Sequence, residues 1–217
     1  SDHLLHTSGV SDAALLSALS VHDEMRIELM AGQYLDVREA GEKTPSVDRS
    51  LRIARYKSGK YTIERPLHLG ASLAIIDRKE RSQLVNVLSA YGLPLGEAFQ
   101  LRDDILGIFG DPSVTGKPAG DDIREGKRTV LMAMTLERAD QQASAKITAA
   151  LGRADLTSDQ IEEIRGLITA TGAVKDVEDL IEGLLSNALT AANSDEIDPS
   201  ARELLIELAT SATRRSH

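Results

Sequence analysis

The sequence predicts an all-α fold. Apolar residues recur with a period of about 3.6 along almost every segment, and no stretch shows the strict alternation that is typical of a strand. Aromatic residues make up only 3% of the 217 residues, so the core must be built from Leu, Ile, Val and Ala, which suits packed helices. A chain of this length can bury a sizeable core, and we expect residues 1–217 to form a single all-α domain.

In the first half, Gly and Pro residues divide the helical pattern. Gly41 is predicted to end a long helix, and Gly59 to interrupt the next one. Pro66 should kink or break the segment that contains it, Gly92 should close another helix, and Pro94 suits the first turn of the helix after that. The predicted helices of this half span residues 11–19, 21–40, 46–57, 60–76, 78–91 and 94–109.

The second half begins with a predicted loop at residues 111–122, which is rich in Gly, Pro and Asp. Thr157 followed by Gln160 fits a capping box at the start of one of the later helices. The predicted helices here span residues 124–139, 142–151, 157–170, 173–193 and 199–213.

Composition excludes several classes of function. The formal net charge is −9 and no long basic run occurs, which argues against a nucleic-acid surface. There is no cysteine, so neither a disulfide framework nor a thiolate metal site is possible. No segment approaches about 18 uninterrupted apolar residues, so we predict no membrane span. The chain begins SDHLLHTSG without a signal-peptide pattern, and we expect a cytoplasmic fragment or processed chain.

The most informative feature is a pair of adjacent carboxylates, Asp103 and Asp104, in an otherwise apolar helical pattern. Gln100 lies one turn before them and Gly107 one turn after, so all four share one helix face. A solvated acidic face is the plain alternative, but the surrounding Leu, Ile and Phe residues favour a buried helix. Carboxylates there are costly unless a cation neutralises them. The simplest cation is a divalent metal that also binds a phosphorylated ligand.

Three further clusters carry polar groups suited to that ligand. Lys117 and Lys127 flank the acids of the following loop, and lysine ammonium groups bind phosphate well. Either lysine alone could instead be an ordinary surface residue. Lys57, Ser58 and Tyr61 fall within one turn in ARYKSGKYTIERPLHLG, which could instead be an exposed helix end. Gln33 and Asp36 lie beside a glycine in MRIELMAGQYLDV, where a buried polar pair is the structural alternative.

Together and in this order, the clusters resemble the trans-polyprenyl diphosphate synthases, especially bacterial farnesyl and geranylgeranyl diphosphate synthases. The resemblance covers the whole chain as the C-terminal portion of such an enzyme, with an isoprenoid-synthase-type helical bundle. FQLRDDILGIFGD is similar to the second aspartate-rich motif of the family, and TGKPAGDDIREGKRT to the segment after it. YKSGKYTIERP is similar to its Lys-Thr helix, and GQYLD to its Gly-Gln-x-x-Asp helix.

The resemblance implies metal-binding and acidic roles at four positions. Asp103 and Asp104 would face a Mg²⁺ ion that bridges to diphosphate, with Asp103 the more direct ligand. Gln100 would support that site. Asp122 stands where the family keeps an acid near the diphosphate-binding lysines.

It also implies roles for five residues around the substrate. Lys57 and Lys117 would bind the diphosphate of the allylic substrate, and Lys127 would close over it. Ser58 stands where Thr is usual and keeps the hydroxyl group, and Tyr61 would help to line the site.

Gln33 and Asp36 would face the region where an allylic cation forms. The implied reaction transfers an allylic group (dimethylallyl, geranyl or farnesyl) from its diphosphate onto isopentenyl diphosphate, and the implied assembly is a homodimer.

The sequence departs from the family pattern in two ways. The third Asp of the second motif is replaced by Gly107, and the first aspartate-rich motif, expected before Ser1, is absent. We therefore predict that the isolated chain is inactive. Two alternatives remain. A class I terpene synthase would need an Asn/Ser/Glu metal triad, which residues 99–129 lack. A non-catalytic partner subunit should have lost the lysines that this chain retains.

Overall fold

A computed structural model describes residues 2–41, 45–116, 118 and 120–214. Within these residues every regular element is a helix, as the sequence predicts. The elements are α1 (Asp2–His6), α2 (Asp12–Ala40), α3 (Val47–Ala54), the π-helix η1 (Arg55–Glu64), α4 (Arg65–Ala74), α5 (Arg78–Phe109), α6 (Pro112–Thr115), α7 (Asp121–Glu125), α8 (Val130–Arg138), α9 (Gln141–Ala150), α10 (Ser158–Ala170), α11 (Ala173–Ala192) and α12 (Pro199–Thr213).

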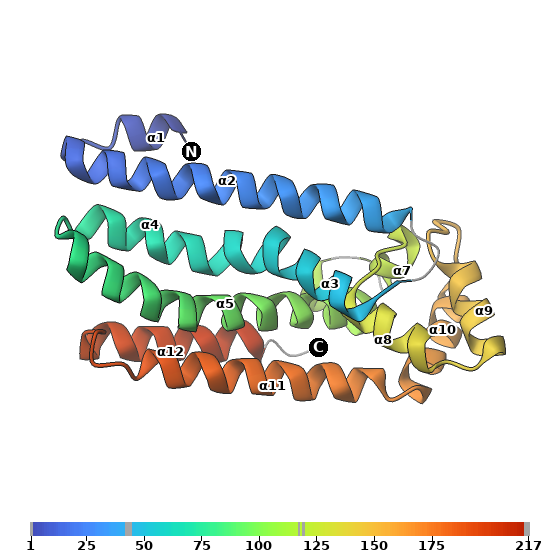
Figure 1. Cartoon of the computed structure of the whole chain (residues 1–217). Helices are drawn as coiled ribbons and strands as arrows, with labels where there is room; N and C mark the ends of the chain where they lie inside the picture. Colours follow the sequence, from blue (N-terminus) through green and yellow to red (C-terminus); the bar gives the residue numbers. More distant parts are fainter. Residues whose placement is uncertain (1, 42–44, 117, 119, 215–217) are drawn as a thin grey trace.

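The long helices lie side by side in four layers (Figure 1). Helix α2 forms one outer layer and packs against the run α3–η1–α4, which in turn packs against α5. Helices α11 and α12 cover the other side of α5. The shorter helices α7 to α10 gather at one end of the bundle. Helix α5 is thus the central element, because it contacts the layers on both of its sides.

Two apolar clusters form the core along α5. The larger contains Leu101, Ile105 and Ile108 of α5 together with residues of α7 to α11. The smaller contains Tyr91 and Leu95 with residues of α11 and α12. Both clusters consist almost entirely of aliphatic side chains, as the low aromatic content predicts.

The predicted break between residues 19 and 21 is wrong, because α2 runs without interruption from Asp12 to Ala40. No Gly or Pro stands near residue 20, so nothing in the local sequence ends the helix there. Gly41 caps the helix at its C-terminus as predicted. Apolar residues on the outer face of α2 stay exposed in this chain: Ile27, Met30, Tyr34 and Val37.

Residues 47–74 form one continuous helical run, so Gly59 does not interrupt it. The middle of the run is the ten-residue π-helix η1. Pro66 occupies one of the first positions of α4, directly after η1. The prediction that Pro66 would break the segment is wrong, because the chain stays helical through it and changes from π-helix to α-helix directly before it.

Helix α5 is also continuous, and the predictions that Gly92 ends a helix and that Pro94 starts one are wrong. Gly92 instead allows a close approach to the η1–α4 junction, since a Cβ atom at residue 92 would lie 2.9 Å from the Glu64 Cα atom. Burial of α5 between two layers outweighs the local preference of both residues.

The predicted loop at 111–122 contains the short helix α6 and the start of α7, and α8 begins at Val130 rather than at 124. Gly126 ends α7 with a left-handed φ of 70°, and the Thr129 hydroxyl caps α8. The four later helices are confirmed to within one residue at each end. The capping box of Thr157 and Gln160 is confirmed as well.

No helix in the described ranges is both long enough and apolar enough to cross a bilayer.

Candidate functional site

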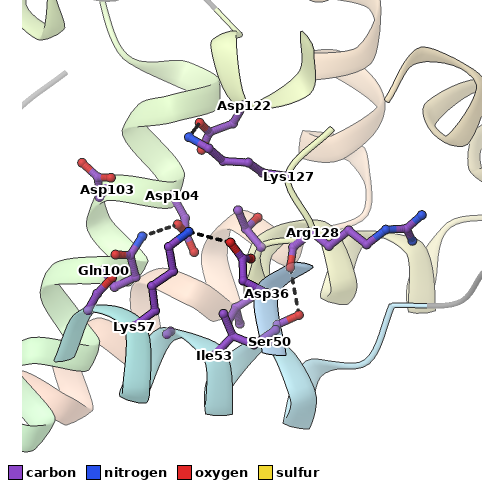
Figure 2. Close-up of a pocket in the computed structure, with 14 residues that line it drawn as sticks. Asp36, Ser50, Ile53, Lys57, Gln100, Asp103, Asp104, Asp122, Lys127 and Arg128 are labelled. Carbon is purple, nitrogen blue, oxygen red and sulfur yellow. Dashed lines mark hydrogen bonds and ion pairs between the residues drawn. The ribbon is translucent and has the colours of Figure 1, made fainter. Parts of the chain in front are cut away.

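A cavity of about 230 Å³ opens where α2, η1, α5 and the segment from α7 to α8 meet (Figure 2). This volume lies below the range of about 300–1,000 Å³ that whole small-molecule sites usually have. It therefore suits a charged head group rather than a complete ligand with a long apolar tail. The lining is mostly polar and consists of Asp36, Ser50, Ile53, Ala54, Lys57, Ser58, Gln100, Asp103, Asp104, Asp122, Lys127, Arg128, Thr129 and Val130.

The position of Lys57 is fixed by close backbone packing around η1. A Cβ atom at Gly32 of α2 would lie only 2.5 Å from the backbone nitrogen of Lys57. On the other side, a Cβ atom at Gly96 of α5 would lie 2.5 Å from the Gly59 Cα atom. The two glycines let η1 fit tightly between its neighbours. This packing holds the π-helical turn that presents Lys57 and Ser58 to the cavity.

Lys57 is paired across two layers. Its Nζ atom lies 2.6 Å from Oδ2 of Asp36, near the C-terminus of α2. Both side chains are partly exposed, Lys57 by 35% and Asp36 by 42%, so solvent weakens the attraction between them. An incoming anion can therefore compete with Asp36 for the ammonium group.

Asp104 is one of two buried acids of the cavity, with 6% of its surface exposed. Its Oδ1 atom accepts a hydrogen bond of 2.8 Å from Nε2 of Gln100, one turn earlier on α5. Burial raises the pKa of Asp104 to about 8, and the charges of Asp122 and Asp103 act in the same direction, although the Gln100 hydrogen bond opposes them. The Asp104 carboxylate thus lacks enough positive charge around it, which is the condition that a bound cation relieves.

A second ion pair lines the cavity near Asp104. Lys127 Nζ lies 2.5 Å from Oδ1 of the buried Asp122 and 3.0 Å from Oε2 of the exposed Glu125. Burial lowers the pKa of Lys127, but the hydrogen bond to Asp122 and the charges of both acids outweigh it, so the pKa lies above its ordinary value. Lys127 is therefore a permanent cation at neutral pH.

Eight of the predicted residues line this one cavity: Asp36, Lys57, Ser58, Gln100, Asp103, Asp104, Asp122 and Lys127. Gln33 and Tyr61 are exposed and do not belong to its lining. Lys117 lies outside the described residues. The structure therefore brings together residues that the sequence places on four separate segments.

The sequence analysis missed several lining residues. Ser50, Ile53 and Ala54 precede Lys57 by seven, four and three residues, so helical spacing alone could have placed them on its face. The Ser50 hydroxyl donates to the backbone carbonyl of Arg128 at 3.0 Å and joins α3 to the segment before α8. The Arg128 side chain itself points away from Lys57 and Asp104 (Figure 2).

The acidic residues fit one part of a magnesium site. Asp103, Asp104 and Asp122 offer oxygen donors, which Mg²⁺ prefers, and the buried Asp104 lacks a compensating charge. Across the described ranges, however, no three acidic or histidine side chains converge closely enough to hold a metal on their own. A metal here would need further oxygen ligands, such as those of a diphosphate.

The chain is an all-α bundle whose carboxylates and lysines surround one cavity of head-group size. The sequence matches the model of the polyprenyl synthetase family over residues 4–168. The chain therefore belongs to this family.

Individual relatives agree with this assignment. A geranylfarnesyl diphosphate synthase of Aeropyrum pernix is 30% identical over 91% of this chain and 59% of its own length. A geranylgeranyl diphosphate synthase of Mycobacterium tuberculosis is 32% identical over 67% of this chain and 40% of its own length. A geranylgeranyl pyrophosphate synthase of Corynebacterium glutamicum, solved with isoprenyl diphosphate and magnesium, superimposes with a TM-score of 0.92 at 42% identity.

This chain is shorter than these relatives. It covers 60% of the Corynebacterium glutamicum chain, whereas that structure covers 99% of this one. The curated relatives named above are matched over 59% and 40% of their lengths.

Proposed function

We propose that this chain carries the diphosphate- and metal-binding wall of an enzyme that elongates an allylic prenyl diphosphate with isopentenyl diphosphate. The observation that supports this most directly is the convergence of Asp103, Asp104, Lys57 and Lys127 on one cavity sized for a head group. Membership of the polyprenyl synthetase family supports the reaction type. Dimethylallyl, geranyl or farnesyl diphosphate would be the allylic substrate.

In this proposal, Lys57 and Lys127 bind oxygen atoms of the allylic diphosphate, with Lys117 as a further candidate. Asp103 and Asp104 hold Mg²⁺, which when bound neutralises charge on the departing diphosphate. Gln100 keeps the Asp104 carboxylate oriented through its 2.8 Å hydrogen bond. The result is a site that stabilises negative charge on the leaving group, which is the main obstacle to breaking the allylic C–O bond.

The remaining residues act on the organic part of the substrate. Ile53 and Ala54 are buried apolar residues at the cavity, where they help to exclude water from an allylic cation. Asp36, with Ser58 beside Lys57, would face the carbon that becomes this cation. Gln33 and Tyr61 remain candidates at the rim, because both are exposed in this chain.

We further propose that the 217-residue chain binds the allylic diphosphate without turning it over. Its described residues supply one acidic wall, and they contain no group of three acids that could complete a metal site. The complete site would need a second aspartate-rich segment.

The test is calorimetric titration of the purified chain with geranyl diphosphate, with and without Mg²⁺. We expect Mg²⁺-dependent binding that Lys57→Ala weakens by about tenfold or more, because a charge-assisted hydrogen bond is lost. Lys175→Ala is the matched control, since Lys175 lies on α11 with 76% of its side chain exposed. Absence of Mg²⁺-dependent binding would refute the proposed site. Elongated product from this chain with isopentenyl diphosphate would refute the proposed lack of turnover.

A further inference from the structure

A second groove, of about 480 Å³, lies along α3 and the start of η1. Its volume is about twice that of the head-group cavity and falls within the usual range for small-ligand sites. Its described lining consists of Asp48, Leu51, Arg52, Arg55 and Tyr56, and none of these residues lines the head-group cavity. The groove is therefore a separate place at which a ligand can bind.

The groove and the head-group cavity use different faces of one helical run. The five groove residues follow the i, i+3, i+4, i+7, i+8 spacing that forms a single stripe on a helix. A second stripe of the same run faces the head-group cavity and consists of Ser50, Ile53, Ala54 and Lys57. An anion in the groove thus does not occupy the position of an anion in the cavity.

The helical run that carries the groove is locally basic. Residues 47–64 contain five basic and two acidic side chains, which gives a net charge of +3, whereas the whole chain has a net charge of −9. A local positive potential on an otherwise acidic protein raises the concentration of anions at that place.

Two arginines supply the hydrogen-bond donors of the groove. Arg52 is exposed, and its side chain has no hydrogen bond or ion pair among the described residues. Arg55 is 49% exposed and donates its Nε–H to Glu97 of α5, which holds the guanidinium group in place. Since the two arginines are three positions apart, both can reach one ligand, and each guanidinium can donate two parallel hydrogen bonds to phosphate oxygen atoms.

The rest of the lining favours an anion that carries no metal. Asp48 is the only acid in the described lining, and a single carboxylate does not hold Mg²⁺, which needs several oxygen ligands. Tyr56 adds a hydroxyl group that can donate to the anion, and Leu51 adds an apolar wall. The groove differs in this respect from the head-group cavity, where Asp103 and Asp104 suit a metal.

We propose that this groove is a second anion site, which binds a diphosphate group through Arg52 and Arg55 without a metal ion. The anion site itself stands on the groove and its arginines. The choice of diphosphate as the ligand rests on the proposed function, because that reaction releases inorganic diphosphate from the neighbouring cavity. The released diphosphate would then be held on the other face of the helical run that carries Lys57.

The test is calorimetric titration of the 217-residue chain with inorganic diphosphate, after a chelating resin has removed divalent ions. We expect one binding site under these conditions. Arg52→Gln should weaken the binding by about tenfold or more, because hydrogen bonds between charged groups are lost. Arg55→Gln should have a similar effect, and because it also leaves Glu97 without its partner, circular dichroism checks that the variant folds. Arg52→Gln keeps the test decisive if Arg55→Gln does not fold.

Two control variants separate the groove from the head-group cavity and from the overall charge. Lys57→Ala should leave metal-free binding of diphosphate within about twofold of the parent, because Lys57 does not line the groove. Arg78→Gln, at an exposed position at the start of α5, removes the same charge as Arg52→Gln and should also leave the binding within about twofold. Inorganic phosphate should bind at least about fivefold more weakly than diphosphate, because it is too small to engage both arginines fully.

Three results would overturn the inference while leaving the proposed function intact. They are no binding of diphosphate without metal, a loss in Lys57→Ala that is absent from Arg52→Gln, and equal losses in Arg78→Gln and Arg52→Gln. Phosphate that binds as tightly as diphosphate would overturn the choice of ligand. Conversely, metal-free binding that depends on Arg52, together with no Mg²⁺-dependent binding of geranyl diphosphate, would overturn the proposed function and support the anion site.

Discussion

The ammonium group of Lys57 lies 2.6 Å from the carboxylate of Asp36, which joins the π-helix η1 to the end of α2 at the mouth of the cavity. The residues are 21 positions apart, and each is more than one third exposed. The pair keeps the lysine extended toward the cavity while leaving it available to a stronger anionic partner. In the proposed site, Asp36 would thus be both a guide for Lys57 and a competitor of the diphosphate.

Asp36→Asn should therefore strengthen the binding of inorganic diphosphate with Mg²⁺ by about two- to fivefold, because an exposed ion pair is worth at most about 1 kcal/mol. Calorimetric titration measures the effect. Asp155→Asn is the control, since it removes the same charge from an exposed loop pair with Arg153. Weaker binding in Asp36→Asn would show that guidance of Lys57 outweighs the competition.

Gly96→Ala should destabilise the chain by about 2 kcal/mol or more, because overpacking at a backbone contact forces helices apart. The new methyl group would meet the backbone of Gly59, at 2.5 Å from its Cα atom. Urea denaturation measures the change in the free energy of unfolding. Gly183→Ala on α11 is the control, because no atom lies within 4 Å of its added Cβ, and it should stabilise by about 0.5–1 kcal/mol. Equal effects at both positions would contradict the close packing of η1.

His68 should make the chain less stable at acidic pH. Its side chain is 2% exposed. Arg65 can only donate to Nδ1, so the neutral ring carries its proton on Nε2, 3.0 Å from the Ser89 hydroxyl. Burial lowers the pKa of His68 below its ordinary value, with Arg65 acting in the same direction against Glu64. The unfolded chain thus binds the proton more tightly. The contribution of neutral His68 to the free energy of unfolding is fully present above about pH 6.5. It is lost as the pH falls toward the lower pKa that His68 has in the folded chain.

His68→Gln should consequently show a smaller loss of stability between pH 7.5 and pH 5 than the parent, measured by urea denaturation at both values. His6→Gln, at an exposed position of α1, should leave the pH dependence unchanged. A parent-like pH dependence in His68→Gln would mean that other groups cause the acid sensitivity.

The sequence was a good guide where local signals and tertiary packing agree. Thr157 and Gln160 predict the start of α10 because both partners of the capping box are local. Gly92 and Pro94 mislead because packing of α5 on both sides outweighs their preferences. The π-helix was not predictable, since it depends on glycines of two other helices that approach its backbone.

In the candidate site, too, the sequence indicated the residues with local signals but not the contacts between helices. Asp103, Asp104, Lys57 and Lys127 stand out in the sequence because charged residues are unusual in such apolar patterns or occur in recognisable motifs. The pairing of Lys57 with Asp36 could not be read from the chain, because it joins two different helices. For the same reason the close approach of the Asp122 carboxylate to Gly107 could not be predicted from the sequence.

Asp104 should couple the stability of the metal-free chain to pH in the opposite sense to His68. Its pKa is raised by burial to about 8, well above the ordinary value of an unfolded Asp, so the folded chain binds this proton more tightly. The resulting stability is fully present below about pH 4 and is lost as the pH rises through about 8. In the metal-free chain, Asp104→Asn should remove this dependence and raise stability at pH 9 by about 2 kcal/mol or more, because an uncompensated buried charge disappears.

Thermal unfolding between pH 6 and pH 9 without divalent ions measures this difference, with Asp195→Asn on an exposed turn as the control. The same proton would link Asp104 to the proposed metal, because a carboxyl group must lose its proton before it can bind Mg²⁺. Titration of the parent with Mg²⁺ and diphosphate at pH 7 should therefore release a proton, which calorimetry in buffers of different ionisation enthalpy detects, and Asp104→Asn should reduce that release. If Asp104→Asn keeps both the pH dependence and the proton release of the parent, then Asp104 is not the group that loses a proton when the metal binds.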